Sequence, residues 1–128
     1  MVSIVDVLSA IRDEKSLLLF KTIARSNSER STSTLNLRSR QYYSRMSELV
    51  KADLVSRRDG KYFLTTFGKI VDHAQTSIET AMGNYWKLKA IDNLENSNQI
   101  PQEEYNKIIH LLIDNEGTKE QLIKPYNH

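Results

Sequence analysis

The chain has 128 residues, of which 39% are hydrophobic and 27% charged, with four Gly and two Pro. This composition is typical of one globular domain with room for an extension, and it excludes collagen-like and wholly disordered chains. The absence of Cys excludes disulfides, thiolate metal sites and a cysteine nucleophile. The longest apolar run of the first half, Leu17 to Phe20, is far shorter than a membrane span, and the N-terminus lacks the basic lead-in of a signal peptide. We therefore expect a cytoplasmic protein without membrane association.

The net charge of +2 is unevenly distributed along the chain. Residues 38–69 hold eight basic and three acidic side chains, whereas residues 70–128 hold five basic and nine acidic ones. This asymmetry indicates either a polyanionic partner for the middle segment or a solvated face that happens to be basic.

Two helices are predicted before the basic segment. Ser3 and Asp6 resemble an N-cap pair, and the apolar residues that follow recur at helical spacing, which predicts a first helix to about Arg12. Asp13 can cap a second, amphipathic helix. The stretch from Ser26 to Thr34 is rich in Ser, Thr and Asn, so we expect a loop or one short turn there.

A third helix is predicted over residues 39–52. Tyr42, Met46, Leu49 and Val50 form a single apolar stripe at helical spacing. Hydrogen-bond donors and cations fall elsewhere around this helix, namely Arg40, Gln41, Tyr43, Ser44, Ser47 and Lys51. Its face away from the core is therefore predicted to be polar and basic.

Two strand-like runs, residues 54–58 and 61–65, flank the dipeptide Asp59-Gly60. This dipeptide favours a type I′ turn because both central residues need a positive φ, which Gly adopts freely and Asp tolerates. The sequence therefore predicts a two-stranded hairpin with a basic tip.

A long helix is predicted after the hairpin, from Thr65 or Thr66 to about Leu94. Its apolar residues are spaced alternately by four and three, as in a heptad seam, through Phe67, Val71, Ala74, Ile78, Ala81, Tyr85 and Leu88. The seam either joins two copies of the chain or packs within one copy. Gly83 is unfavourable inside a helix by about 1 kcal/mol relative to Ala, so a break at Gly83-Asn84 is an alternative to one continuous helix.

The C-terminal part is predicted to be helical as well. Trp86 and Tyr85 are interpreted as buried contacts. Pro101 suits the first position of another helix, and Thr118 is predicted to cap a final short turn.

The order of these elements, together with residues 39–71, resembles the winged helix-turn-helix transcriptional regulators and is most similar to the small single-domain regulators of archaea. The residues that carry the resemblance are Ser39, Tyr42, Arg45, Met46 and Leu49 in the helix, Ala52-Asp53-Leu54-Val55 at its exit, Lys61-Tyr62-Phe63-Leu64-Thr65 in the second strand, and Gly68. Many relatives have Gly at the position of Asp53, because the chain leaves the helix there in a left-handed conformation. The resemblance covers roughly residues 12–80.

The resemblance implies an α+β, mainly helical fold. A winged helix-turn-helix domain with a two-stranded wing is expected over residues 1–80, and a helical extension that is a candidate dimerisation region over residues 81–128.

The resemblance also implies that the chain binds double-stranded DNA and regulates transcription. Helix 39–52 would enter the major groove, and wing 54–65 would contact the backbone or the adjacent minor groove. Base contacts are assigned to Arg40, Gln41, Tyr43 and Ser44, and phosphate or wing contacts to Arg38, Arg45, Lys51, Arg57, Arg58 and Lys61. A homodimer with Val71, Ala74, Ile78, Ala81, Tyr85 and Leu88 as its seam would place two such helices in successive major grooves, about 34 Å apart.

Each of these roles has a structural alternative. Tyr43 can cover the edge of the core. Arg45 can pair with Glu48 or another nearby acid. Arg57 and Arg58 can protect the strand edges with charge.

Enzymatic chemistry is not expected. The three His residues lack metal-ligand spacing, and the sequence has neither a Gly-rich phosphate loop nor a nucleophile elbow. No cofactor or metal is therefore predicted. The alternative function is a winged-helix protein-interaction module of the transcription machinery, which requires an apolar outer face on helix 39–52, where this sequence is polar and cationic.

Overall fold

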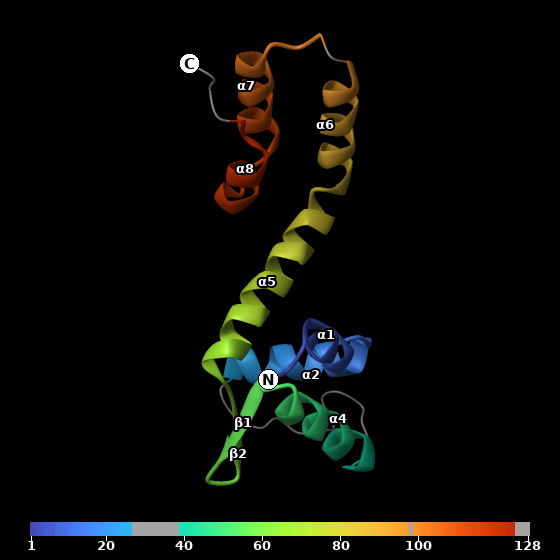
Figure 1. Ribbon diagram of the computed structural model, residues 1–128, viewed down its shortest axis with the longest axis vertical. Helices are drawn as coiled ribbons and strands as arrows, with labels where there is room; N and C mark the ends of the chain where they lie inside the picture. Colours follow the sequence, from blue (N-terminus) through green and yellow to red (C-terminus); the bar gives the residue numbers. More distant parts are fainter. Residues whose placement is uncertain (27–38, 98, 125–128) are drawn as a thin grey trace. The chain divides into compact units, whose positions relative to one another are not determined.

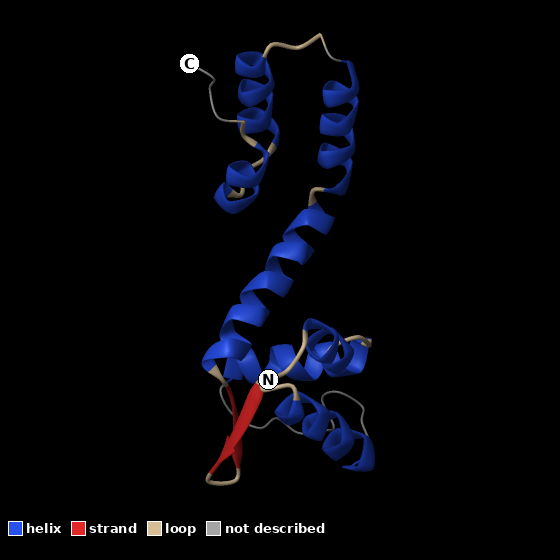
Figure 2. Ribbon diagram, viewed as in Figure 1, coloured by secondary structure: helices blue, strands red, loops and turns tan. Residues whose placement is uncertain are grey.

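The computed structural model describes residues 1–26, 39–97 and 99–124. It is an α+β, mainly helical structure whose described part contains one two-stranded antiparallel sheet (Figures 1 and 2). The chain forms two compact units, Met1–His73 and Ala74–His128. The division thus falls after His73, whereas the sequence placed it after residue 80. The loop predicted between Ser26 and Thr34 lies almost wholly outside the described residues.

The two N-terminal helices begin at side-chain caps. Helix α1 (Ile4–Ala10) has a capping box, in which the backbone N of Asp6 donates to Ser3 Oγ (3.1 Å) and the backbone N of Ser3 donates to Asp6 Oδ2 (2.9 Å). Helix α2 (Glu14–Ser26) follows Asp13, whose Oδ1 accepts a hydrogen bond from the backbone N of Ser16 (2.8 Å). Both caps satisfy donors that helix geometry leaves without partners, and both were predicted from the sequence.

The core of the first unit joins α1, α2, α4 (Ser39–Lys51) and the hairpin. Its buried residues are Val7, Ala10, Leu19, Phe20, Ile23, Tyr42, Met46, Leu49, Ala52, Leu54, Val55 and Tyr62. Of the stripe predicted on α4, only Val50 is exposed. Full burial of a large apolar side chain stabilises the fold by about 1.5–3 kcal/mol. This buried stripe therefore determines which side of α4 faces solvent.

The exit of α4 is a tight backbone junction. Asp53 has a φ of 61°, the left-handed conformation that the family resemblance implied for this position. Thr65 donates from its backbone N to the carbonyl oxygen of Leu54 (3.1 Å) and from its hydroxyl to the carbonyl oxygen of Asp53. Its Oγ1 also accepts a hydrogen bond from the backbone N of Gly68 (2.8 Å). Thr65 is thus the cap of α5 (Thr66–Gly83), and it fixes the start of α5 to the end of α4.

The hairpin has the predicted turn. Strands β1 (Val55–Arg58) and β2 (Lys61–Leu64) pair antiparallel, with Arg58 opposite Lys61. Asp59 and Gly60 have φ values of 51° and 77°, so both central residues of the turn adopt positive φ, as a type I′ turn requires.

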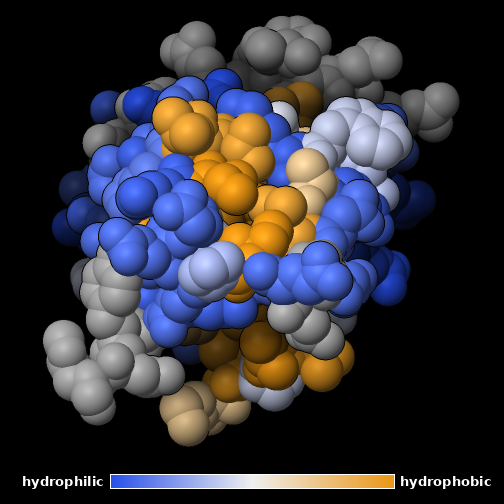
Figure 3. All heavy atoms as spheres, turned by 90° about the horizontal axis from the view of Figure 1, so that it is seen from above, coloured by the Kyte–Doolittle hydropathy of each residue, from blue (hydrophilic) through white to orange (hydrophobic). Residues whose placement is uncertain are grey.

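The second unit contains the end of α5 and helices α6 (Tyr85–Ser97), α7 (Gln102–Leu112) and α8 (Glu116–Leu122). Its small core consists of Ile91, Tyr105, Ile109 and Ile113, against which Leu88, Ile100, Leu112, Leu122 and Ile123 pack while partly exposed. Figure 3, seen from the end where α6 and α7 are connected, shows apolar groups that reach the surface between hydrophilic ones.

The long helix predicted to Leu94 is not continuous, because α5 ends at Gly83 and α6 begins at Tyr85. The alternative, a break at Gly83-Asn84, is thus the one observed. The backbone N of Asn84 is shared between the carbonyl oxygens of Thr80 (3.2 Å) and Ala81 (3.1 Å). Its side-chain Nδ2 also donates to the carbonyl of Thr80 (3.2 Å). The side chain of Asn84 thus hydrogen-bonds to a backbone carbonyl of the preceding turn and competes with regular helix hydrogen bonds. Gly83 is a poor helix former, and the two residues together explain the break.

In the C-terminal helices, the cap of α8 differs from the prediction, and the hydrogen bonds of Asn106 were not predicted. Asn115, rather than Thr118, caps the last helix, since its Oδ1 accepts from the backbone N of Thr118 (2.9 Å). Asn106 of α7 forms two hydrogen bonds to the backbone of Lys124 (2.9 and 3.1 Å), which hold the segment after α8 against α7.

Within the described ranges, no helix combines the length and the hydropathy that crossing a bilayer requires.

The junction at Gly68 generates a stability prediction. A Cβ at this position would lie 2.1 Å from the carbonyl oxygen of Leu54, so Gly68→Ala should lower the free energy of unfolding by about 2 kcal/mol. Gly83→Ala is the matched control, because nothing lies within 4 Å of its Cβ, and it should raise stability by up to about 1 kcal/mol. Urea unfolding followed by circular dichroism measures both. Equal effects of the two substitutions would contradict the close approach at Gly68.

Candidate nucleic-acid interface

The outward side of α4 carries a row of exposed polar and basic side chains, Arg40, Ser44, Ser47 and Lys51. These positions alternate by four and three, so they lie on one face of the helix. The opposite side is held in the core by Tyr42, Met46 and Leu49. Burial of the apolar stripe therefore forces this row toward solvent.

An open groove of about 670 Å³ lies beside α4, against the end of α1 and the start of α2. Three of the four residues predicted to contact bases, Arg40, Gln41 and Ser44, line this groove. Arg12, which the sequence analysis did not single out, lines it as well. The structure thus brings these three predicted residues onto one surface and adds a further cation to it.

Tyr43, the fourth residue predicted to contact bases, does not line the groove. Gln41 and Tyr43 are about 200° apart around the helix axis, because each residue advances by about 100°. The Tyr43 side chain is 63% exposed, and its ring meets that of Tyr42 edge to face, with the centroids 5.2 Å apart. It therefore lies on the other flank of α4, where its contact with Tyr42 covers one edge of the core.

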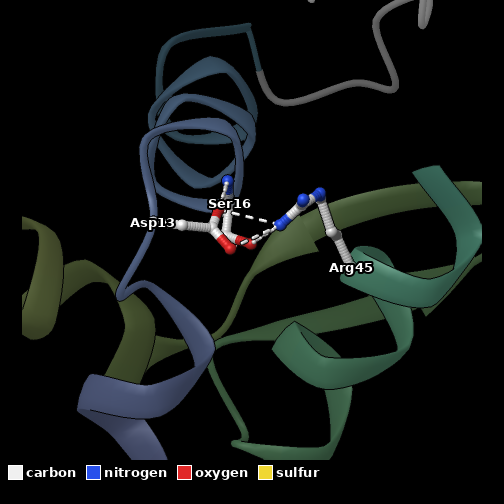
Figure 4. Close-up of polar contacts among 3 residues, drawn as sticks. All are labelled: Asp13, Ser16 and Arg45. Carbon is white, nitrogen blue, oxygen red and sulfur yellow. Dashed lines mark hydrogen bonds and ion pairs between the residues drawn. The ribbon is translucent and has the colours of Figure 1, made fainter. Parts of the chain in front are cut away.

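Arg45 is directed toward α2 rather than into solvent (Figure 4). Its Nη1 donates to both carboxylate oxygens of Asp13 (2.8 and 2.7 Å) and to Oγ of Ser16 (2.8 Å). The alternative in which Arg45 pairs with a nearby acid is thus the one observed, and the phosphate contact predicted for it is corrected. The physical reason is that Asp13, already oriented as the cap of α2, places a carboxylate where α4 packs.

The Asp13 carboxylate is stabilised in its charged form. The hydrogen bond from the backbone N of Ser16 and, next, the Arg45 guanidinium lower the pKa of Asp13 from 3.8 to about 2. The carboxylate thus serves two elements at once, as the cap of α2 and as the ionic partner of α4.

Three further predicted contact residues, Arg57, Arg58 and Lys61, are exposed on the hairpin. The register pairs Arg57 with Tyr62 on one face and Arg58 with Lys61 on the other. The Arg57 guanidinium lies 5.6 Å from the centroid of the Tyr62 ring, and that of Arg58 lies 4.7 Å from the centroid of Phe63. These cation–π contacts orient both guanidinium groups without neutralising their charge.

The first unit therefore presents five exposed cations on α4 and the hairpin, Arg40, Lys51, Arg57, Arg58 and Lys61. We call this set the basic cluster. No member forms an ion pair with any carboxylate of the described residues, whereas Arg45 does. Arg38, also predicted to contact phosphate, lies outside the described residues. Among the described residues, the positive charge of the basic cluster is thus not neutralised by an ion pair.

Sequence reasoning missed Arg12 and did not identify Asp13 as the acid that pairs with Arg45. The cap at Asp13 carries a local signal, but its ionic partner is 32 residues away along the chain, and only the packing of α4 on α2 brings the two together. No group of three or more His, Asp or Glu suited to a metal ion occurs in the part of the chain that the structure describes.

Comparisons with protein-family models, with curated proteins and with solved structures found no match for this chain.

The pKa of Asp13 generates a prediction for stability against pH. Because its folded pKa lies below its ordinary value of 3.8, the ionised carboxylate stabilises the fold fully above that value, and this stabilisation is lost as the pH falls toward about 2. Asp13→Asn keeps an acceptor for the Ser16 amide and removes the charge. The substitution should lower the free energy of unfolding at pH 7 by about 1 kcal/mol. The effect is small because the Asp13 side chain is nearly half exposed, and water screens its charge.

Urea unfolding at pH 7, 4 and 2.5 checks this prediction, and the difference between wild type and Asp13→Asn should shrink at the lowest pH. Glu48→Gln is the control. Glu48 lines the same groove, but its carboxylate forms no ion pair with the described residues. A difference that stays constant across the three pH values would contradict the role of the Asp13 charge.

Proposed function

We propose that the chain is a winged-helix protein that binds double-stranded DNA and regulates transcription. In this proposal α4 is the recognition helix in the major groove, and the hairpin is the wing on the backbone or the adjacent minor groove. The observation that carries the proposal is the basic cluster, five exposed cations on these two elements of one compact unit, none of which pairs with a carboxylate of the described residues. Lys and Arg side chains that are free to replace condensed counterions supply most of the affinity of a protein for DNA.

The shape and chemistry of α4 support this role. The major groove of B-form DNA is about 12 Å wide and admits one α-helix. The outward row of α4 combines small hydroxyl side chains with Arg40 and Lys51, so the helix can approach base edges closely. Gln41 can pair bidentately with adenine and Arg40 with guanine, which provides for sequence preference.

A winged helix used as a protein-interaction module is the alternative function. Such a module would present an apolar outer face on α4 to its partner. Here the outward row is polar and cationic, and the exposed Tyr43 and Val50 lie to one side of it. The surface of α4 therefore favours nucleic acid over an apolar protein partner.

The basic cluster predicts a strong dependence of DNA affinity on salt. With five phosphate contacts, the slope of log affinity against log salt concentration should be about −4.5, which corresponds to about a 500-fold loss between 50 and 200 mM salt. Fluorescence anisotropy with a mixed-sequence duplex measures this slope. The absence of binding at both salt concentrations, or an affinity that hardly changes, would contradict the proposal.

The two kinds of contact should respond differently to substitution. Arg58→Ala should weaken binding to all sequences alike and make the salt slope shallower by about 1, because it removes one phosphate contact. Gln41→Ala should change the order of preference among duplexes, measured by selection from a random pool. Lys15→Ala, which removes an exposed cation of α2 outside the groove, is the control and should change neither. Uniform losses in both test variants would contradict the division of roles.

A further inference from the structure

Four apolar side chains near the break between α5 and α6 are exposed to solvent. Ile78 and Met82 are one turn apart on α5 and are 61% and 70% exposed. Trp86, in the first turn of α6, is 80% exposed, and its ring meets that of Tyr85, which is also exposed, edge to face at 5.2 Å between centroids. We call these four residues the apolar ridge. All belong to the second unit.

The apolar ridge is separate from the core of its own unit. Helix α6 packs on that core through Leu88 and Ile91. The helix therefore carries apolar side chains both on its core side and at Tyr85 and Trp86, a pattern typical of a helix that is covered on two sides. The prediction that Tyr85 and Trp86 are buried is wrong for the single chain. Several exposed apolar side chains in one segment, with Trp among them, are a usual mark of a protein–protein contact.

A groove of about 370 Å³ begins at the apolar ridge. Its apolar lining comes from Ile78, Ala81, Leu88 and Leu122, and its polar rim includes Thr118 and Gln121. Ile78 belongs to both the ridge and the groove. The same segment of chain thus carries the exposed indole of Trp86 and, at Ile78, one wall of an apolar groove. A surface that carries both a protrusion and an apolar depression can meet an identical surface about a two-fold axis.

The charges around the ridge specify a direction for such a contact. Glu79 lies on the N-terminal side of Met82, and Lys87 and Lys89 lie on its C-terminal side. Two antiparallel copies place the acidic end of one ridge beside the basic end of the other. Two parallel copies place like charges together, which is unfavourable.

We propose that the apolar ridge binds the apolar ridge of a second copy of this chain, antiparallel about a two-fold axis near Met82, with Trp86 of each copy in the groove of the other. This contact differs from the heptad seam predicted from the sequence. Val71 packs against the first core and Leu88 against the second, so both are engaged within their own chain. Ile78, Ala81 and Tyr85 of the predicted seam remain at the contact, and Met82 and Trp86 join them. The dimer gives the proposed DNA-binding protein two recognition helices, but it does not depend on DNA binding.

The oligomeric state of variants tests the proposal. Met82→Glu places a charge at the centre of the contact and should give a monomer, whereas the wild type should sediment as a dimer at about 100 µM. Leu111→Glu is the matched control, because Leu111 is 81% exposed on α7 of the same unit and lies outside the ridge and the groove. It should remain a dimer. A monomeric wild type, or a Met82→Glu variant that remains a dimer, would overturn the proposal.

Tryptophan fluorescence supplies a second readout, since Trp86 is the single tryptophan of the chain. Its emission should shift to longer wavelength when the wild type is diluted, because the indole leaves the groove of the other copy and enters water. Met82→Glu should show the long-wavelength emission at every concentration. Emission that does not respond to dilution, while sedimentation reports dissociation, would overturn the placement of Trp86 at the contact.

The antiparallel arrangement has its own test. The chain has no native Cys, so Met82→Cys introduces a single thiol, which should form an intermolecular disulfide under mild oxidation because two-fold symmetry brings the two copies of residue 82 together. Leu111→Cys should not form this disulfide.

Glu79→Lys should weaken the dimer about tenfold, and the additional changes Lys87→Glu and Lys89→Glu should restore it. Failure to restore the dimer would overturn the antiparallel pairing.

The DNA proposal and the dimer proposal fail separately. Monomeric Met82→Glu keeps the basic cluster and should still bind a duplex with a steep dependence on salt. If the wild type dimerises as described but neither protein binds DNA, the proposed function is wrong and the dimer stands.

Discussion

The junction at Asp53 and Leu54 determines how the first unit presents its charges. Asp53 turns the chain in a left-handed conformation at the end of α4, and Thr65 fastens the far end of the hairpin to the carbonyl groups of Asp53 and Leu54. Gly68 allows α5 to begin directly against the Leu54 carbonyl. Because both ends of the hairpin are fixed at one point, the cations of α4 and of the hairpin are held on a single structural frame. A looser exit from α4 would leave the two sets of charges independent.

Within that frame, arginine serves two physical purposes. Arg45 lies where α4 meets the capped start of α2, and its ion pair with Asp13 and hydrogen bond to Ser16 fix the rotation of α4 about its own axis. Arg40, only five residues earlier, faces solvent and lines the groove. The side chains are chemically identical, so their roles follow from their positions around the helix and from the nearest carboxylate. The positive surface therefore contains fewer cations than the charge of residues 38–69 implies.

Features that depend on adjacent residues could be predicted from the sequence. The type I′ turn at Asp59-Gly60 and the caps at Ser3 and Asp13 follow from the conformational preferences of a few neighbouring residues. The left-handed conformation of Asp53 was implied by the family resemblance. The polar outer face of α4 was also predictable, because the apolar stripe on the same helix determines which side is buried.

Features that depend on distant segments could not be predicted. The partner of Arg45 is set by the packing of α4 on α2, and Tyr43 lies away from Gln41 because of its position around the helix. The heptad pattern from Phe67 to Leu88 has the spacing of a coiled-coil seam, yet Val71 packs on the first core and Leu88 on the second. Only the break at Gly83-Asn84 within this pattern had a local signal. The exposure of Trp86 has no sequence signal, since apolar spacing does not distinguish a core from a contact with another chain.

The central claim is that α4 and the hairpin together form the surface that contacts a DNA duplex. The most direct measurement is a titration of the isotopically labelled protein with a mixed-sequence duplex, followed through the chemical shifts of its backbone amides. The account predicts that the largest shifts fall between Arg40 and Lys61, on both elements, with a second group at Arg12 and Asp13 where the groove meets α2. Shifts confined to α7 and α8, or an unchanged spectrum at low salt, would contradict it.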